Sequence, residues 1–239
     1  MWINKEKKCV ELWDAHYYKV ADDLYYPSVT TVLQTINKGY GYDDWLKNVG
    51  HNADLIVKKA QESGSKIHNE IECFLRGETI LPQMFDENEW VKMCNFANWA
   101  NDLNLEVIAT ETELFDHEMQ LAGTADLICK IDDVMYLIDF KTGNNIYATS
   151  HMQVACYVTM WNRQFGMEKG VIKKAGLLHI GSATRKKEGL NAKGIKFEET
   201  DIIKYTKLFQ HTLAIYNEMF RKRAPLLTYP SSLEFNRKE

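Results

Sequence analysis

The sequence has few cysteines, and none of them stands in a spacing that binds metal. The five cysteines lie at positions 9, 73, 94, 129 and 156, odd in number and widely scattered. Because neither C-x2-C pairs nor a paired framework is present, we expect reduced thiols, as in a cytosol. The same absence argues against zinc sites and iron–sulfur clusters.

Long apolar runs and an excess of positive charge are also missing. No segment approaches the roughly 18 apolar residues of a membrane span, and the start MWINKEKKCVELWDAH lacks the apolar core of a signal peptide. We therefore expect a cytoplasmic, intracellular protein with no membrane partner. Since the formal net charge is −4, any DNA-binding surface must be a local basic patch.

Internal repeats, low-complexity tracts and composition breaks are absent too. The 239 residues, 45% of them hydrophobic, suit a single domain with one sizeable core. We divide this domain into a mainly helical part (1–105), a sheet core (106–200) and a C-terminal helix with a tail (201–239). The order helices, β-meander, helix, strands, helix predicts an α/β (α+β) fold with a central mixed sheet flanked by helices.

Capping residues and apolar spacing predict the limits of several helices. Ser28 is placed to cap a helix that begins near Val29. The helical pattern of residues 53–75 is interrupted around Gly64, and Gly77 fits its C-cap.

Two further helices are predicted over residues 88–103 and 150–163. Thr149 or Ser150 is the expected cap of the second helix. The residues of the first helix that are expected to face the core are Trp90, Cys94, Ala97 and Trp99 or Ala100.

The most informative stretch is GTADLICKIDDVMYLIDFKTG, residues 123–143. Two β-prone runs flank Asp132-Asp133, and an even-length turn centred on that pair makes the numbers of opposing residues sum to 265. Asp126 then faces Asp139. Like charges in opposed positions destabilise a sheet unless something compensates for them, and a divalent cation would do so.

Side-chain alternation adds a lysine to this acidic pair. Lys141 shares a face with Asp139, whereas Ile138 and Phe140 point into the opposite, apolar layer. Carboxylate oxygens suit Mg²⁺ or Mn²⁺, and a lysine beside them would orient the attacking water and offset charge on the phosphate. A D-x-K pair alone is also common as a solvated ion pair, but the combination predicts a metal-dependent phosphodiesterase site.

Two polar pairs at helical spacing extend the candidate site. His68 and Glu72 share a helix face, as ligands or as a supporting pair would. Gln153 and Tyr157 repeat this spacing on the helix that follows Lys141. Either pair alone is also compatible with an ordinary half-buried helix face.

In order, the segments GSKIHNEIE, GTAD, IDFKT and QVACY resemble the RecB-type branch of the PD-(D/E)XK nuclease superfamily, over residues 27–157. PSVTTVL, followed by DDWL and the histidine helix, is similar to phage exonucleases and to the mitochondrial genome-maintenance exonuclease. The resemblance implies a restriction-endonuclease-like core with a helical N-terminal part. It is also compatible with a virus-encoded protein.

The resemblance implies a role for each residue that matches a motif. His68, Asp126 and Asp139, with the backbone carbonyl of Phe140, would hold Mg²⁺ or Mn²⁺, and Lys141 would be the catalytic lysine. Gln153 and Tyr157 would position the DNA strand or support the lysine. On the preceding strand Glu111 and Glu113 both fit an acidic position of the family, and alternation puts them on one face, so both stay open.

DNA is the partner that the resemblance implies, with a preference for single-stranded ends. Ser28 and Thr30 would touch phosphates near a helix start. The basic residues Arg185, Lys186 and Lys187 would follow the strand. The aromatic residues available to stack on bases are Tyr25, Tyr26, Tyr40, Tyr42 and Trp45.

The function predicted from the sequence is that of a metal-dependent DNA exonuclease that hydrolyses phosphodiesters by direct attack of a metal-activated water. One alternative is a double-strand DNA exonuclease of the phage recombination type. Another is a catalytically degenerate nuclease fold that binds DNA. The oligomeric state is left open by the sequence.

Overall fold

The structure is a computed structural model of the 239-residue chain. It describes residues 2–3, 9–12, 15–21, 24–36, 39–185 and 191–220, of which 2–3, 9–12, 40, 182–185 and 191–193 are described by their backbone alone. Of the predicted DNA contacts, Lys186, Lys187 and the side chain of Arg185 therefore lie outside the described residues.

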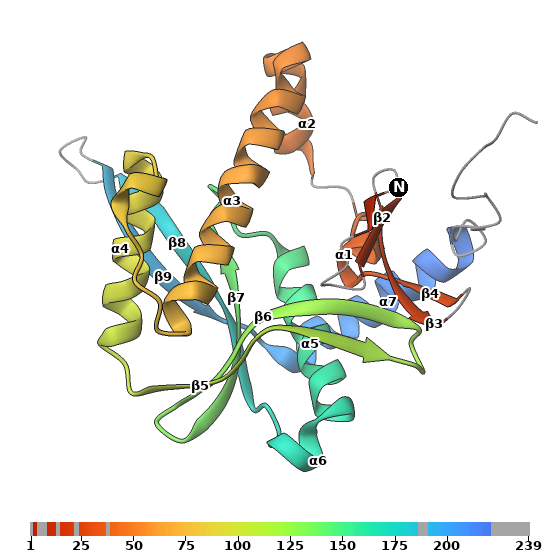
Figure 1. The fold of residues 1–239 in the computed structure, drawn as a ribbon. Helices are drawn as coiled ribbons and strands as arrows, with labels where there is room; N and C mark the ends of the chain where they lie inside the picture. The colour runs from red at the N-terminus through yellow and green to blue at the C-terminus, as the bar shows by residue number, and fades with distance from the viewer. Residues whose placement is uncertain are drawn as a thin grey trace, which may run out of the picture.

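A five-stranded mixed sheet forms the centre of the protein (Figure 1). All neighbouring strands pair antiparallel except the third and fourth, which are parallel. This arrangement confirms the predicted meander and the fold class of a mixed sheet flanked by helices. The strands, in their order across the sheet, are β5 (Leu105–Asp116), β6 (Leu121–Ile131), β7 (Val134–Lys141), β8 (Lys174–Arg185) and β9 (Asn191–Glu199).

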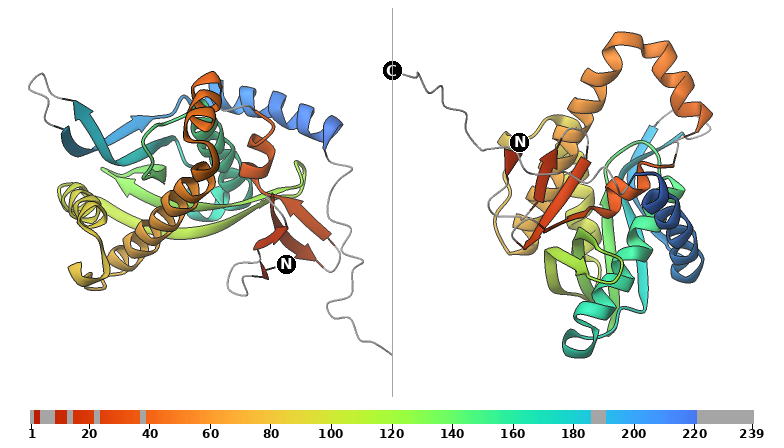
Figure 2. Two further views of the ribbon diagram at one scale, coloured as in Figure 1. Left: turned by 90° about the horizontal axis from the view of Figure 1, so that it is seen from above. Right: turned by 90° about the vertical axis from the view of Figure 1, so that its right-hand side faces the viewer.

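Helices cover both faces of this sheet (Figures 1 and 2). On one face α3 (Ala53–Leu75) and α4 (Glu87–Asn101) enclose a core that includes Phe96 and Phe140. On the other face lies α5 (Ala148–Gln164), with α7 (Ile202–Met219) packed on it, around Trp161. The shorter helices are α1 (Val29–Leu33), α2 (Tyr40–Val49) and α6 (Gly166–Lys169), and 3-10 turns lie at Gly50–Asn52 and Pro82–Met84.

A second, antiparallel sheet precedes the first helix. Its strands are β1 (Trp2–Ile3), β2 (Cys9–Leu12), β3 (Ala15–Ala21) and β4 (Leu24–Pro27). Tyr18 and Tyr26 pack this sheet against Ala122 of β6, and Ser28 forms a parallel bridge to the same alanine. Within residues 1–105, helices predominate only from Val29 onward. The assignment of the chain to a single domain stays a prediction.

The predicted hairpin register is confirmed. Pairs from Leu127↔Ile138 to Ile131↔Val134 all sum to 265. Asp132 and Asp133 have φ values of 48° and 64°, as a two-residue turn of type I′ requires. The turn therefore fixes which side chains of β6 and β7 meet.

Several predicted details of the helices are wrong. α3 continues through Gly64, whose lack of a side chain instead permits close approach to Thr142: a Cβ there would lie 3.1 Å from Oγ1. On α5 neither predicted hydroxyl is the cap, because the helix begins after Tyr147, which makes no side-chain cap bond. The cap by Ser28 is confirmed. The C-cap of α3 is Arg76, and Gly77, with a φ of 87°, is the next residue and not the cap itself.

The core face of α4 was predicted correctly in part. Asp86 and Glu89 form a capping box that starts the helix one residue earlier than predicted. The buried residues are Glu89, Met93, Phe96 and Ala100. Trp90 and Trp99 are partly buried and pack against the same core, so the prediction is confirmed at Trp90, Trp99 and Ala100. Cys94 is exposed, which corrects its predicted place in the core. Glu89 is buried because Lys66 and Ser63 of α3 bond its carboxylate.

The state of the cysteines and the presence of membrane-spanning helices can be reported for the described residues alone. Cys73, Cys94, Cys129 and Cys156 are unpaired thiols. No helix among the described residues has both the length and the apolar composition needed to cross a membrane.

The contact between β8 and β9 allows a test of the fold. A Cβ at Gly176 would lie 2.5 Å from the backbone oxygen of Glu198 and would also meet the ring of Phe197. We expect Gly176→Ala to destabilise the protein by about 1–3 kcal/mol or more, measured by urea unfolding. Gly194→Ala in the paired strand, where a Cβ meets nothing within 4 Å, should change stability by less than about 0.5 kcal/mol. Equal stability of both variants would contradict the packing of this strand pair.

Candidate active site

Two carboxylates meet where β6 and β7 lie side by side. The strand pairing of the hairpin ends at Leu127 and Ile138, and Asp126 and Asp139 are the next residue on each strand. The backbone N–H of Phe140 donates a 2.7 Å hydrogen bond to Asp126 Oδ2, which ties this carboxylate to the neighbouring strand. Asp139 is only 2% exposed.

A lysine accompanies the acidic pair. Lys141 Nζ lies 2.6 Å from Asp139 Oδ2, as predicted from alternation along β7. This oxygen is buried and, although it is ion-paired, takes part in no hydrogen bond of good geometry. Buried carboxylate oxygens normally have hydrogen-bond partners, so Asp139 has unused capacity for a ligand.

Helix α3 contributes a histidine. His68 Nδ1 lies 3.5 Å from Asp126 Oδ2, and its ring packs edge-on against Phe140, with 5.6 Å between the ring centroids. The same helix packs Ile67 and Ile71 into the core. His68 is therefore held over the end of the hairpin by the apolar residues around it.

The structure distinguishes between the two glutamates of β5. Pairs Thr110↔Leu127 and Thr112↔Ala125 set Glu111 opposite Asp126. Glu111 has a φ of 44°, a left-handed conformation that costs a non-glycine residue about 1–2 kcal/mol. Such strain is often retained where a side chain must be directed to a functional site.

Three of these side chains form a group that can hold a cation. One ligand atom from each of His68, Glu111 and Asp126 lies within 4.8 Å of the others. Among the described residues, Glu113 does not belong to this group. Asp139, whose Oδ2 is ion-paired with Lys141, lies outside this group of three. A nitrogen and two carboxylate oxygens so close together fit a divalent metal ion.

The two aspartates differ in their pKa values. Burial raises the pKa of Asp139 to about 6, with Asp126 adding to the effect and Lys141 opposing it. Burial also acts to raise the pKa of Asp126, but His68, Lys141 and the Phe140 N–H together hold it below its ordinary value. Asp126 is therefore ionised at neutral pH, and ionising Asp139 without a cation is costly.

The basic partners show the complementary effect. Burial acts to lower the pKa of Lys141, yet Asp139 and Asp126 hold it above its ordinary value. Burial likewise acts to lower the pKa of His68, but Asp126 and Asp139 outweigh it and the pKa is raised. Lys141 is thus a charged ammonium at neutral pH.

Helix α5 supports Lys141 from the other side of the site. Lys141 Nζ donates to Gln153 Oε1 at 3.2 Å, and Gln153 Nε2 donates to the Tyr157 hydroxyl at 3.3 Å. The Tyr157 ring fits only because Gly123 has no side chain: a Cβ there would lie 2.8 Å from the hydroxyl oxygen. Among the alternatives left open by the sequence, these contacts favour support of the lysine.

The backbone just after Lys141 is held from two directions. Lys92 Nζ donates to the Thr142 carbonyl at 3.1 Å. His179 Nε2 lies 2.6 Å from the Gly143 carbonyl. His179 was not identified from the sequence, because only the parallel pairing of Lys141 with His179 brings the two strands together.

The remaining residues that were predicted for the site differ in their exposure and in their hydrogen-bond partners. Ser28 is 3% exposed and its hydroxyl caps α1 by accepting from Thr31 N, so it is engaged inside the protein. Thr30 is exposed. Glu72 pairs with Arg76 and accepts from the Thr110 hydroxyl, outside the cation group.

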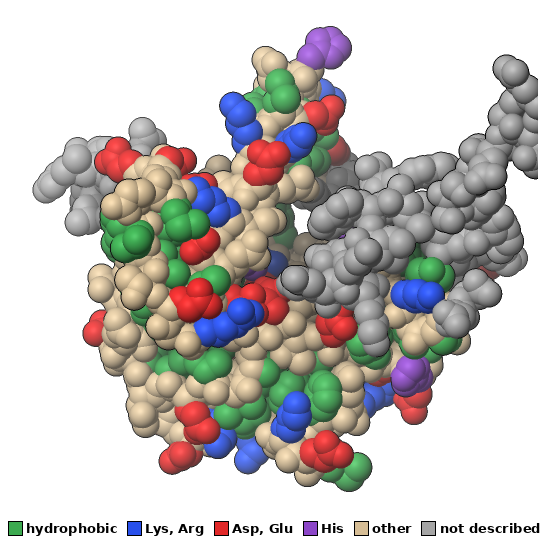
Figure 3. Space-filling view, in the orientation of Figure 1, with side chains coloured by type: hydrophobic (Ala, Val, Ile, Leu, Met, Phe, Trp, Pro, Cys, Tyr) green, Lys and Arg blue, Asp and Glu red, His purple; other side chains and the backbone are tan. Residues whose placement is uncertain are grey.

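The aromatic candidates are likewise divided. Tyr26 is buried, with its hydroxyl 3.0 Å from His117 Nδ1, and Tyr25 is half-buried. Tyr42 and Trp45 stack on each other on α2, with centroids 5.7 Å apart. Helix α2 and the first half of α3 project from the body as an arm (Figures 1 and 2), and Figure 3 shows acidic and basic side chains interspersed on it beside a hollow.

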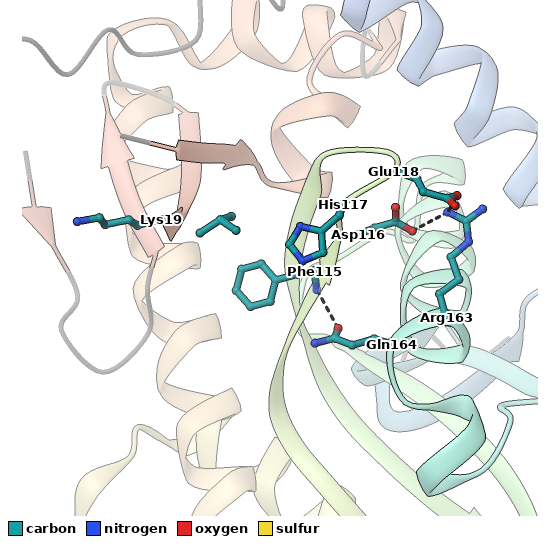
Figure 4. Close-up of a pocket in the computed structure, with 8 residues that line it drawn as sticks. Lys19, Phe115, Asp116, His117, Glu118, Arg163 and Gln164 are labelled. Atoms are coloured by element: carbon teal, nitrogen blue, oxygen red, sulfur yellow. Dashed lines mark hydrogen bonds and ion pairs between the residues drawn. The ribbon is translucent and has the colours of Figure 1, made fainter. Parts of the chain in front are cut away.

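A cavity of about 600 Å³ lies at the far end of the β5–β6 hairpin (Figure 4). The described residues that line it do not belong to the group of side chains that can hold a cation. Arg163 lies there, 2.8 Å from Asp116 and 3.0 Å from Glu118. The Phe115 N–H donates to Gln164 Oε1. These contacts join α5 to the β5–β6 hairpin.

The mixed sheet and its acidic cluster define a class of α/β protein equipped to hold a divalent cation. A family model of the PD-(D/E)XK nuclease superfamily matches residues 54–231, well over half of the chain. The chain therefore belongs to the PD-(D/E)XK nuclease superfamily, whose nucleases use divalent metals.

Other comparisons add little to this assignment. No curated protein matches the chain. Among solved structures, "Crystal structure of SSO0001" is 17% identical to it, over 54% of this chain and 59% of that chain, with a TM-score of 0.27. The match thus spans less than two thirds of that protein, and this likeness carries no argument.

Asp139→Asn is expected to stabilise the metal-free protein at pH 8 by about 1–3 kcal/mol. The folded-state pKa of Asp139 is about 6, above the value of about 4 in an unfolded chain. The contribution of Asp139 to the stability of the wild type should thus be greatest below pH 4 and should fall as the pH rises toward 6. Asparagine carries no charge, so the variant loses no stability at this position over the same range. Urea unfolding of the wild type and the variant in EDTA, at pH 4 and at pH 8, checks this. A stability difference that does not depend on pH would contradict it.

The choice between the two glutamates has its own test. We expect Glu111→Gln to weaken Mn²⁺ binding by about 10–100-fold, the usual range for changes around a metal site, whereas Glu113→Gln should leave it within about threefold. Titration calorimetry with Mn²⁺ measures both variants. Equal weakening by the two substitutions would remove the assignment of Glu111.

Proposed function

We propose that the protein is a divalent-metal-dependent DNA exonuclease of the RecB-type branch that prefers single-stranded DNA ends. The observation that carries this proposal is the meeting of Asp126, Asp139 and Lys141 at the end of one hairpin. Membership of the nuclease superfamily supports it.

His68, Glu111, Asp126 and Asp139 are the side chains that would hold Mg²⁺ or Mn²⁺, with the Phe140 carbonyl as a further ligand. When bound, such an ion acts as a Lewis acid toward the phosphate and lowers the pKa of water. Hydrolysis then proceeds by direct attack of water, and no nucleophilic side chain forms a covalent intermediate.

Lys141 acts as a cation rather than as a base. Because Asp139 and Asp126 raise its pKa, the ammonium keeps its protons and donates hydrogen bonds to the attacking water or to the phosphate oxygen that gains charge. Gln153 and Tyr157 restrict its direction through their chain of hydrogen bonds. They are therefore positioning residues, and Lys141 is the catalytic residue.

The preference for single strands rests on the surroundings of the cluster. Stacked Tyr42 and Trp45 lie on the projecting α2, where an unpaired base could extend the stack. Thr30 is exposed at the start of α1, with its hydroxyl 2.8 Å from the Ser28 hydroxyl, and suits a phosphate contact. Ser28 would act there through its cap of the helix.

Lys141→Ala should reduce cleavage by about 10²–10³-fold, the usual cost of removing one donor that stabilises developing charge, while DNA binding stays close to wild type. Thermal unfolding checks that the variant is folded. Lys130→Ala is a matched control, since Lys130 also lies on a hairpin strand but pairs with Glu106 away from the cluster. The assay is digestion of end-labelled single-stranded and blunt duplex DNA with Mg²⁺, Mn²⁺ or EDTA. The position of the label and the product ladder report polarity and exonuclease action.

Wild-type-like cleavage by Lys141→Ala would eliminate the assignment of the lysine. Faster digestion of duplex than of single strand would favour the double-strand exonuclease. Failure to cleave any DNA with either metal would favour a degenerate DNA-binding module.

A further inference from the structure

The N-terminal sheet meets β6 close to the candidate active site (Figure 1). Pairing of β6 with β7 ends at Leu127. Because Ala122 pairs with Phe115 of β5 on one edge of β6, its bridge to Ser28 lies on the edge that β7 has left. In this region the Tyr18 hydroxyl of β3 lies 2.9 Å from Thr124 Oγ1.

Tyr18 is fixed by its surroundings. The side chain is 7% exposed, and its ring packs edge-on against Phe115, with 6.1 Å between the centroids. A buried tyrosine hydroxyl usually has a hydrogen-bond partner, and Thr124 is one for Tyr18. The family match begins at residue 54, so membership of the superfamily does not account for this contact.

Thr124 adjoins the residue that makes room for the Tyr157 ring. A Cβ at Gly123 would lie 2.8 Å from the Tyr157 hydroxyl oxygen, so a small shift of β6 at this point would move the ring. Burial raises the pKa of Tyr157 well above its ordinary value, and the nearby Tyr18 adds to the effect. Tyr18 therefore lies close to Tyr157 as well as to Thr124.

The Tyr157 hydroxyl sets the direction of Lys141 through one amide. Gln153 Nε2 donates to the hydroxyl at 3.3 Å, and Gln153 Oε1 accepts from Lys141 Nζ at 3.2 Å. An amide group donates through its nitrogen and accepts through its oxygen. A fixed Tyr157 oxygen therefore determines which end of Gln153 faces the lysine.

We propose that Tyr18 is a positioning residue for Lys141. Its hydroxyl fixes, through Thr124, the part of β6 against which the Tyr157 ring packs. The amide of Gln153, held by Tyr157, then directs the ammonium. The proposal rests on the proposed function, in which this ammonium donates to the attacking water or to the phosphate, and it makes the N-terminal sheet a part of the active site.

The same sheet offers a matched control. Tyr26 faces Tyr18 across β3 and β4, and it is 5% exposed. Its hydroxyl also bonds a side chain of the β5–β6 hairpin, but that partner is His117 Nδ1 at 3.0 Å, in the turn after Asp116. Tyr18→Phe and Tyr26→Phe each remove one buried hydroxyl and keep the ring, so both should lower the midpoint of thermal unfolding by a similar amount, about 2–4 °C.

The first readout is steady-state cleavage of a single-stranded oligonucleotide by the full-length chain. We expect Tyr18→Phe to lower kcat about 3–10-fold, the effect of one hydrogen bond. KM should stay within about twofold, because the lysine acts in the transition state. Tyr26→Phe, which acts far from Lys141, should change neither value by more than about twofold. Equal kcat values for the two tyrosine variants would overturn the proposal and leave the nuclease intact.

Variants of Thr124 test the first step of the route. Thr124→Val removes the other hydroxyl of the pair and should repeat the loss of kcat, whereas Thr124→Ser keeps a hydroxyl and should restore most of it. A wild-type kcat in Thr124→Val would overturn the route from Tyr18 through Thr124.

A double variant tests the second step. Tyr157→Phe removes the hydroxyl through which Tyr18 acts, so adding Tyr18→Phe to it should lower kcat by less than about twofold more. Two single effects that multiply in full in the double variant would show that Tyr18 acts independently of Tyr157, and would overturn the proposal.

The second readout needs no cleavage. In EDTA, the NMR signals of the Gln153 side-chain amide, identified by their loss in Gln153→Leu, report the bond to Tyr157. Tyr18→Phe should shift these signals, and Tyr26→Phe should leave them in place. This result in a protein that cleaves no DNA would support the link from Tyr18 to the amide while removing the exonuclease. Unchanged signals in both variants would overturn the positioning role.

Discussion

The structure depends on two carboxylates that the β6–β7 hairpin forces together. Asp126 and Asp139 meet because the turn at Asp132-Asp133 fixes the register, and like charges so placed destabilise a sheet. Among the described residues, the Lys141 ammonium and the His68 ring approach one carboxylate each. The pKa of Asp139, raised to about 6, shows that this compensation is incomplete without a further cation.

The rest of the site is arranged around this constraint by elements far apart in the chain. Helix α3 supplies His68, while α5 supplies Gln153, which directs Lys141 toward the acidic pair. Packing makes these positions firm, since Gly123 leaves room for the Tyr157 ring.

Much of this could be predicted from local sequence rules, and the errors have physical causes. Turn length and period two gave the hairpin register, because both are local properties. The choice between Glu111 and Glu113 was left open because a glutamate gives no sign in the sequence of the left-handed φ of 44° that Glu111 adopts. His179 and the buried face of α4 depend on tertiary contacts, the parallel pairing with Lys141 and the bond of Lys66 to Glu89, which no spacing along the chain reveals.

The most direct test of this account is a crystal structure of the protein grown with Mn²⁺, with diffraction data collected at the manganese absorption edge. The account predicts an anomalous peak at bonding distance from His68, Glu111, Asp126 and Asp139, with Lys141 beside it. A peak bound elsewhere, or no peak in crystals that contain millimolar Mn²⁺, would contradict the claim that these carboxylates meet in order to hold a metal ion.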